Sequence, residues 1–109
     1  MSFNIDTKCV YIDNGTDEST GAVNPPIYQS AGFSYSDPNQ LEKVFAGQDF
    51  GYVYSRMSNP TIAELERRVA YIESGISSVA LSSGLAAIFS TAMVLSNAGQ
   101  NLVVSNSLF

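Results

Sequence analysis

The sequence predicts a chain of the α/β class, in which an extended N-terminal arm is followed by the start of a larger domain. Three observations indicate this class. Residues 51–56 alternate as a strand does, and this strand ends where a helix begins at Pro60. Residues 77–81 are expected to form a short buried strand that turns into an apolar helix over 85–95. A further strand is expected over 101–104, so strands and helices alternate along the chain.

The arm is expected over residues 1–50, which are rich in turn formers and contain only a short helical pattern near 41–45. Several large side chains give it more apolar weight than a disordered tail usually has, namely Ile27, Tyr28, Phe33 and Tyr35. An arm that buries little by itself needs a partner surface. We therefore expect it to lie on another subunit or on a further part of the chain.

The helix expected from Pro60 is amphipathic and ends before Gly75. Its apolar residues recur at helical spacing, at Ile62, Leu65, Val69 and Ile72. We expect this face to be buried, with Arg67 and Arg68 on the solvated side. The helix over 85–95 is apolar on almost every side, which indicates burial between a sheet and other elements.

The composition fits a soluble domain of mixed class and restricts its partners. The 109 residues are 45% hydrophobic and carry a net charge of -5, from ten acidic against five basic residues. A chain of this length forms one domain or part of one, and no basic patch is available for nucleic acid. Histidine is absent and Cys9 is the only cysteine, which excludes an internal disulfide and argues against a metal site.

No membrane or secretion signal stands out in the sequence. The chain does not open with a charged and apolar signal pattern, and Ser90 and Thr91 interrupt the longest apolar stretch before it could span a bilayer. We therefore expect a cytoplasmic protein without a membrane partner.

Tyr54 and Arg56 are candidate phosphate ligands. On an alternating strand the two side chains lie on the same face, so a phenol and a guanidinium point to one place. Such a pair suits a phosphate group. The alternative is an ordinary junction between a strand and a helix, with a solvated arginine.

A second candidate phosphate site is the turn of Ser82, Ser83 and Gly84, at the start of the helix over 85–95. The first amide groups of a helix and its dipole attract an anion, and Gly84 allows a phosphate to approach the backbone closely. The alternative is a plain helix cap.

These segments closely resemble the pyridoxal-phosphate enzymes of cysteine and methionine metabolism, which include the cystathionine synthases and lyases, methionine gamma-lyase and O-acetylhomoserine sulfhydrylase. The resemblance rests on the run GYVYSRMSNPT at 51–61 and on the SSG turn at 82–84. It implies that Tyr54 and Arg56 bind the phosphate of a pyridoxal phosphate held by the neighbouring subunit. It further implies that Ser83 and the backbone at Gly84 and Leu85 hold the same group in their own subunit.

The resemblance also implies that Phe109 stacks on the pyridine ring of the cofactor. The family usually has tyrosine at this position, often with a role in proton transfer that phenylalanine cannot perform. Packing in an apolar core is the alternative for Phe109.

By resemblance, the fold is an N-terminal arm over 1–50 followed by the start of a fold-type I pyridoxal-phosphate-dependent transferase large domain. Residues 51–109 would then be the incomplete beginning of the cofactor-binding domain, and the chain would match roughly the first quarter of the family's length. The lysine, acid and arginine that such enzymes need come later in the family's chain. Lys8 and Lys43 do not match that lysine, so we expect no catalytic residue in these 109 residues.

The expected function is that of an N-terminal fragment of an O-acetylhomoserine sulfhydrylase, which replaces the gamma substituent to form homocysteine or methionine. The resemblance implies a small amino-acid substrate and a homo-oligomer, either a dimer or a tetramer. A gamma-lyase acting on methionine or cystathionine is the alternative enzyme. An alternative of another class is a non-catalytic oligomerisation or anion-binding module. The chain by itself is expected to be inactive, since it lacks the family's lysine.

Overall fold

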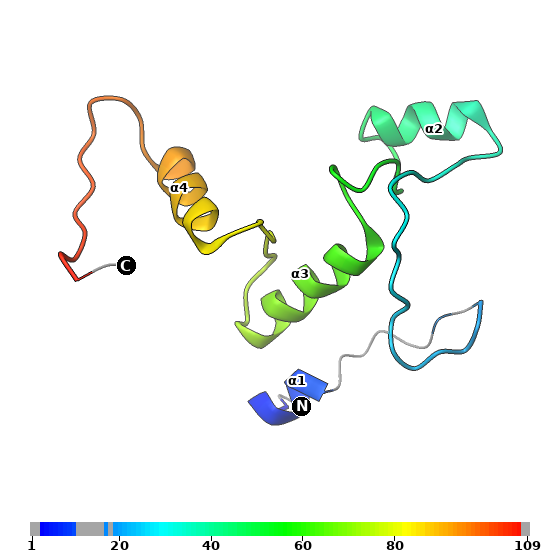
Figure 1. Ribbon diagram of the computed structural model, residues 1–109, viewed down its shortest axis with the longest axis horizontal. Coiled ribbons are helices and arrows are strands. Elements are labelled where there is room, and N and C mark those ends of the chain that lie inside the picture. The colour runs from blue at the N-terminus through cyan, green and yellow to red at the C-terminus, as the bar shows by residue number, and fades with distance from the viewer. Residues whose placement is uncertain (1–2, 11–16, 18, 108–109) are drawn as a thin grey trace. The chain divides into compact units, whose positions relative to one another are not determined.

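The computed structural model describes residues 3–10, 17 and 19–107. This part of the chain contains the helices α1 (Ile5–Val10), α2 (Pro38–Phe45), α3 (Pro60–Ile72) and α4 (Gly84–Leu95), which Figure 1 labels. The chain consists of two compact units, Met1–Ser78 with the first three helices and Val79–Phe109 with α4.

Helices α1 and α2 lie within residues 1–50, over which the arm is expected. The helical pattern expected at 41–45 is confirmed, and α2 begins earlier, because Pro38 occupies its first turn and the Asp37 carboxylate accepts a hydrogen bond from the Asn39 amide at 2.9 Å. Helix α1 was not expected. Its signal is Asn4, whose side-chain oxygen accepts from the Thr7 amide at 2.9 Å in the manner of an N-cap.

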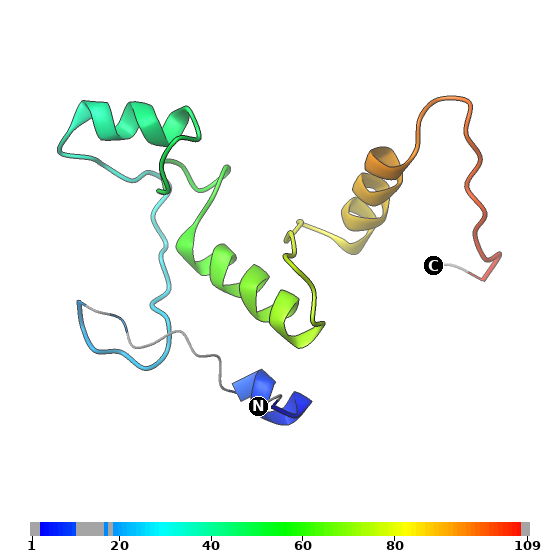
Figure 2. The ribbon, with the colours of Figure 1, turned by 180° about the vertical axis from the view of Figure 1, so that it is seen from behind.

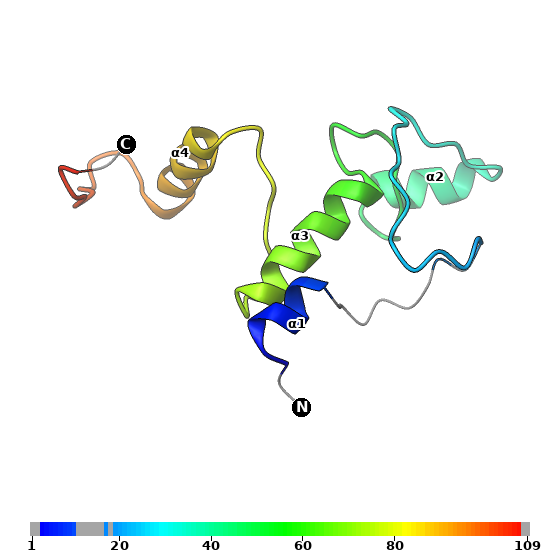
Figure 3. The same cartoon turned by 60° about the horizontal axis from the view of Figure 1, so that its bottom comes forward.

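Helix α3 begins and ends where the sequence predicts. Asn59 is its N-cap, Pro60 follows, and the turn after the helix contains Ser74 at a φ of 55°. The Gly75 amide then donates to the Ala70 carbonyl at 2.8 Å and closes the helix end. Among the described helices, α1 is the one in contact with α3 (Figure 3).

The expected buried face of α3 is not formed within the described residues. Ile62, Leu65 and Val69 are all at least 41% exposed, and Ala70 is the buried residue of the helix. The physical reason is that the short helix α1 covers too little of α3 to remove this face from water. The amphipathic pattern therefore identifies the helix correctly. It does not identify the element that covers the apolar face of the helix.

Residues 31–33 of the arm pair antiparallel with residues 53–55, which lead into α3 (Figure 2). The Phe33 amide donates to the Val53 carbonyl at 3.0 Å, and the Ser55 amide donates to the Ala31 carbonyl at 2.8 Å. Gly32 and Tyr54 form an isolated antiparallel bridge between these bonds. The pairing joins the arm to the candidate phosphate ligands.

The expected strand through Arg56 is wrong, because pairing with the arm ends at Ser55. The amides of Met57 and Ser58 both donate to the Tyr54 carbonyl, at 2.8 and 3.1 Å, which closes a turn over residues 55–57. Once these amides bond within the turn, they are no longer available to a neighbouring strand.

In the second unit, the expected apolar helix is confirmed and begins at Gly84. The Ser83 hydroxyl caps it by accepting from the Ala86 amide at 3.1 Å. Its expected burial is not formed within this unit, where Ile88 and Phe89 are more than half exposed. A helix that is apolar on every side needs covering elements that the described residues of the unit do not provide.

The strands expected over 77–81 and 101–104 are not formed in the described part of the chain. A strand is held by hydrogen bonds to a neighbouring strand, and neither of these segments belongs to a strand ladder among the described residues. Val79 and Val103 are accordingly at least three-quarters exposed rather than buried.

Candidate functional site

Tyr54 and Arg56 lie together on the exposed turn that precedes α3. The guanidinium carbon of Arg56 is 5.5 Å from the centroid of the Tyr54 ring, and Tyr54 is 44% exposed. The turn therefore brings the phenol and the guanidinium to one place, although through a cation–π contact rather than through a shared strand face. Both side chains present hydrogen-bond donors to solvent. The oxygens of a phosphate could accept hydrogen bonds from these donors.

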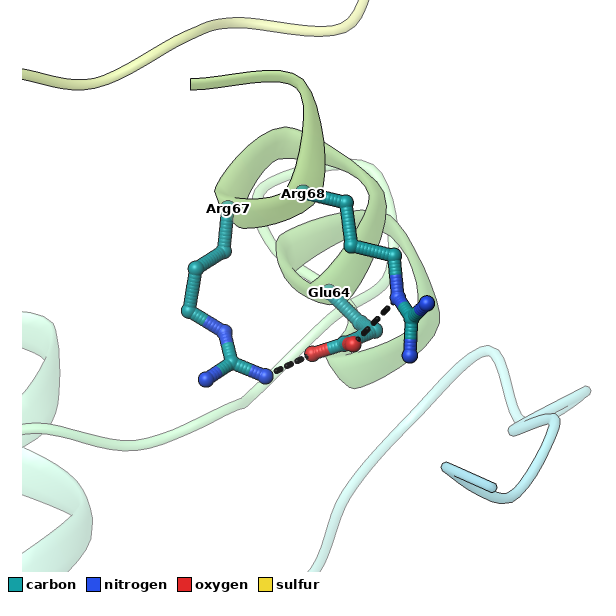
Figure 4. A network of polar contacts seen from close by, with 3 residues as sticks. All are labelled: Glu64, Arg67 and Arg68. Carbon is teal, nitrogen blue, oxygen red and sulfur yellow. Dashed lines mark hydrogen bonds and ion pairs between the residues drawn. The ribbon is translucent and has the colours of Figure 1, made fainter. Parts of the chain in front are cut away.

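Arg56 differs from the arginines of α3 in its charge environment. Glu64 forms ion pairs with both Arg67 and Arg68, at 2.6 Å in the case of Arg68 Nε (Figure 4). Glu64 is only 15% exposed, and its two oxygens each face one guanidinium. Among the residues that the structure describes, Arg56 has no carboxylate within ion-pair distance. Its charge is therefore available to an anion from outside the chain.

The site residue that the sequence pattern did not reveal is Asn59, the N-cap of α3. The side chain is buried, with 7% exposure, and its amide nitrogen donates to the Ser55 hydroxyl at 2.9 Å. Ser55 stands between Tyr54 and Arg56. The signal in the sequence is the choice of asparagine, because only this N-cap residue carries an amide donor besides its acceptor.

An aromatic cluster supports the chain just before the turn. The Tyr52 ring lies 5.8 Å from Phe33 and 5.4 Å from Phe50, measured between centroids, and the Tyr35 hydroxyl donates to the Tyr52 carbonyl at 3.0 Å. Partial burial, together with the neighbouring Tyr28 phenol, raises the pKa of Tyr52 above its ordinary value of 10.0. The raised pKa keeps the Tyr52 phenol neutral at physiological pH, which suits its place in the aromatic cluster.

Ser83, Gly84 and Leu85 together form the amino-terminal end of α4. The first amides of a helix lack intrahelical acceptors, and a Cβ atom added at Gly84 would meet nothing within 4 Å. An anion therefore has room to approach this backbone, and the residues fit a phosphate group. The Ser83 hydroxyl already accepts the capping bond and keeps its own proton for donation.

The candidate residues fall into two groups that belong to different units. Tyr54 and Arg56 belong to Met1–Ser78, whereas the Ser83 to Leu85 turn belongs to Val79–Phe109. Phe109 lies outside the described residues, so its stacking role stays a prediction.

Within the described range, no three histidine, cysteine, aspartate or glutamate side chains are grouped so that they could hold a metal ion. The same range contains no helix with the length and apolarity needed to span a bilayer.

Comparison with known proteins identifies the family. The family model for Cys/Met metabolism PLP-dependent enzymes matches residues 6–109. The chain therefore belongs to the pyridoxal-phosphate-dependent enzymes of cysteine and methionine metabolism, which confirms the resemblance seen in its motifs. Enzymes of this family act on amino acids and depend on pyridoxal phosphate.

Two curated relatives are similar over most of the chain. It is 39% identical over 104 residues to the O-acetyl-L-homoserine sulfhydrylase of Corynebacterium glutamicum, covering 95% of this chain and 24% of that protein. It is 37% identical over 103 residues to the L-methionine gamma-lyase of Pseudomonas putida, covering 94% of this chain and 26% of that protein. The chain thus spans about a quarter of the length of the curated relatives it matches.

A solved structure supports the fold. It is an O-acetylhomoserine (thiol)-lyase from Campylobacter jejuni that contains N'-pyridoxyl-lysine-5'-monophosphate. The TM-score is 0.72 at 33% identity, over 80% of this chain and 21% of that one. The expected fold class, the start of a fold-type I domain, is confirmed by this likeness, even though its strands are not paired in the described residues.

Proposed function

We propose that this chain is the first part of a pyridoxal-phosphate enzyme that replaces the gamma substituent of O-acetylhomoserine and forms homocysteine or methionine. The observation that carries the proposal is the Arg56 guanidinium over the Tyr54 ring, on an exposed turn and without a carboxylate partner in the described residues. The similarity to O-acetyl-L-homoserine sulfhydrylase supports the choice of substrate.

In this proposal the chain binds the cofactor and performs no proton transfer. The Arg56 guanidinium forms charge-assisted hydrogen bonds to the phosphate, and the Tyr54 hydroxyl donates a further one. Ser83 and the amides of Gly84 and Leu85 bind the phosphate at the end of α4. Phe109 stacks on the pyridine ring and, lacking a hydroxyl, moves no proton. The cofactor supplies the electron-withdrawing chemistry when it is bound.

The proposal includes a homo-oligomer, either a dimer or a tetramer, in which Tyr54 and Arg56 serve the neighbouring subunit. The exposed apolar residues of α3 and α4 support this oligomer, because side chains such as Leu65 and Phe89 need covering surfaces.

The proposal also includes a boundary near residue 50 between the arm and the cofactor-binding domain. A cytoplasmic role in methionine metabolism or trans-sulfuration completes it, supported by Cys9 as the single cysteine.

An assay of the full-length protein that contains this chain tests the proposed reaction. We expect homocysteine from O-acetylhomoserine and sulfide, with little release of methanethiol from methionine. The second candidate is a gamma-lyase, which the 37% identity to L-methionine gamma-lyase supports. Efficient release of the thiol from methionine without homocysteine synthesis would favour that candidate.

The non-catalytic module is tested separately. Intact-mass measurement on freshly expressed protein, compared with the length of the reading frame, distinguishes a 109-residue product from a longer enzyme. A natural product of 109 residues that assembles but binds no pyridoxal phosphate would favour the module over the enzyme.

A further inference from the structure

Asn59 is the buried polar residue of the described chain, and all three of its side-chain hydrogen bonds run to different segments. Its oxygen accepts from the Thr61 amide at 2.8 Å, which caps α3. Its nitrogen donates to the Tyr28 carbonyl in the arm at 3.1 Å and to the Ser55 hydroxyl in the turn at 2.9 Å. One side chain therefore connects the helix, the arm and the turn.

Ser55 is fixed to the arm as well. Its hydroxyl donates to the Ser30 carbonyl, and its amide donates to the Ala31 carbonyl at 2.8 Å. With the bond from Asn59, the residue between Tyr54 and Arg56 has partners on two sides. Movement of the turn would break several of these bonds together.

The other helix caps of the chain show that capping alone does not require this arrangement. Asp37 caps α2, Ser83 caps α4 and Asn4 accepts from the Thr7 amide at the start of α1, and all three side chains are exposed. Asparagine, aspartate and serine cap helices about equally well. What distinguishes asparagine at position 59 is its amide group, which offers two donors in addition to the capping acceptor.

We propose that Asn59 is a positioning residue for the phosphate ligands Tyr54 and Arg56. It holds Ser55 so that both side chains can bind the phosphate at the same time. The proposal rests on the proposed function of this pair. Asn59 itself touches neither the cofactor nor the substrate; it acts by removing the freedom of the turn. A turn held in advance loses less conformational entropy when the phosphate binds.

The test compares two ligands on the full-length apo-protein, pyridoxal phosphate and pyridoxal, which differ only in the phosphate. The main variant is Asn59→Ser, which keeps a neutral capping oxygen and removes the amide donors. We expect it to weaken pyridoxal phosphate binding about tenfold while leaving pyridoxal binding unchanged. A merely structural role would change the two affinities by the same factor.

Two further variants serve as references in the same titration. Asp37→Ala removes an exposed cap from α2, and we expect it to lower thermal stability without changing the ratio of the two affinities. Arg56→Ala reports on the phosphate site itself. It should lower the ratio of pyridoxal phosphate affinity to pyridoxal affinity at least as much as Asn59→Ser does.

The outcomes separate the inference from the function on which it rests. A ratio lowered by Arg56→Ala but not by Asn59→Ser overturns the positioning role and leaves the phosphate site intact. A ratio that Arg56→Ala does not change overturns both. If Asn59→Ser yields no folded protein, Ser55→Ala decides instead, because it removes the hydroxyl that the Asn59 amide binds; an unchanged ratio then rejects the proposal.

Discussion

The ammonium group of Lys8 lies over the ring of Tyr71, 5.1 Å from its centroid, and joins α1 to the end of α3. The same nitrogen donates to the Tyr71 carbonyl at 3.4 Å and to the Ser74 hydroxyl at 3.3 Å. A cation near the last carbonyls of a helix interacts favourably with the helix dipole. Lys8 is thus engaged in a structural contact between two helices.

Replacing Lys8 with methionine should loosen α1 from α3. We expect a loss of about 0.5–1 kcal/mol in local stability, because the cation–π contact and the dipole interaction are both removed. Hydrogen exchange of the α1 amides measures this loss. Lys43→Met is the matched control, since Lys43 lies in the last turn of α2 and should leave α1 unchanged. Equal protection of α1 in both variants would contradict the prediction.

Replacing Arg56 with alanine should weaken pyridoxal phosphate binding to the full-length protein. The lost charge-assisted contact is worth about 1.5–3 kcal/mol, and a fluorescence titration of the apo-protein reports it. Arg67→Ala is the control, because this arginine is paired with Glu64 on α3. The phosphate role of Arg56 is rejected if both variants bind the cofactor as the unchanged protein does.

Two inactive variants should regain partial activity when they are produced together. One carries Arg56→Ala, and the other lacks the lysine that holds the cofactor in the full-length protein. A mixed dimer contains one site in which both groups are intact, if Arg56 serves the neighbouring subunit. Mixed dimers that demonstrably form but show no recovered turnover would count against the shared site.

Replacing Gly51 with alanine should destabilise the arm. The added Cβ would lie 2.9 Å from Val44 Cγ2 and closer still to the Tyr35 hydroxyl, which would lose its bond to the Tyr52 carbonyl. We expect a cost of about 1–2 kcal/mol in the free energy of unfolding, measured by urea denaturation. Gly32→Ala is the control, because a Cβ there meets nothing within 4 Å. A larger loss at Gly32 than at Gly51 would show that this packing is wrong.

The stability of the hydrogen-bonded turn formed by Asp17, Ser19 and Thr20 should depend on pH. Hydrogen bonds from the Ser19 and Thr20 hydroxyls hold the pKa of Asp17 below its ordinary value of 3.8. Because the folded pKa is lowered, the stabilisation is present above 3.8 and is lost as the pH falls through the folded value. NMR titration of the Asp17 carboxyl measures the shift, and Ser19→Ala should move it back towards 3.8. An Asp17 that titrates identically with and without the Ser19 hydroxyl would refute this origin.

The sequence by itself determined where α3 and α4 begin, and it determined the family. Asn59 with Pro60, and Ser83 before Gly84, start helices through hydrogen bonds to residues only two or three positions away, so their effect can be recognised from local order. The motifs at 51–61 and 82–84 identified the family for the same reason, since each is a short contiguous run.

Only the tertiary structure decided how these elements are held. The antiparallel pairing ends at Ser55, whose amide donates to Ala31, a residue 24 positions earlier in the chain, and the turn at 55–57 begins there. Helix α1 is held by Lys8 at Tyr71, which is 63 residues away. Besides capping α3, Asn59 joins the helix to the arm through its bond to the Tyr28 carbonyl, which is 31 positions distant. Hydrogen bonds over such separations depend on the path of the whole chain, and residue spacing alone does not encode them.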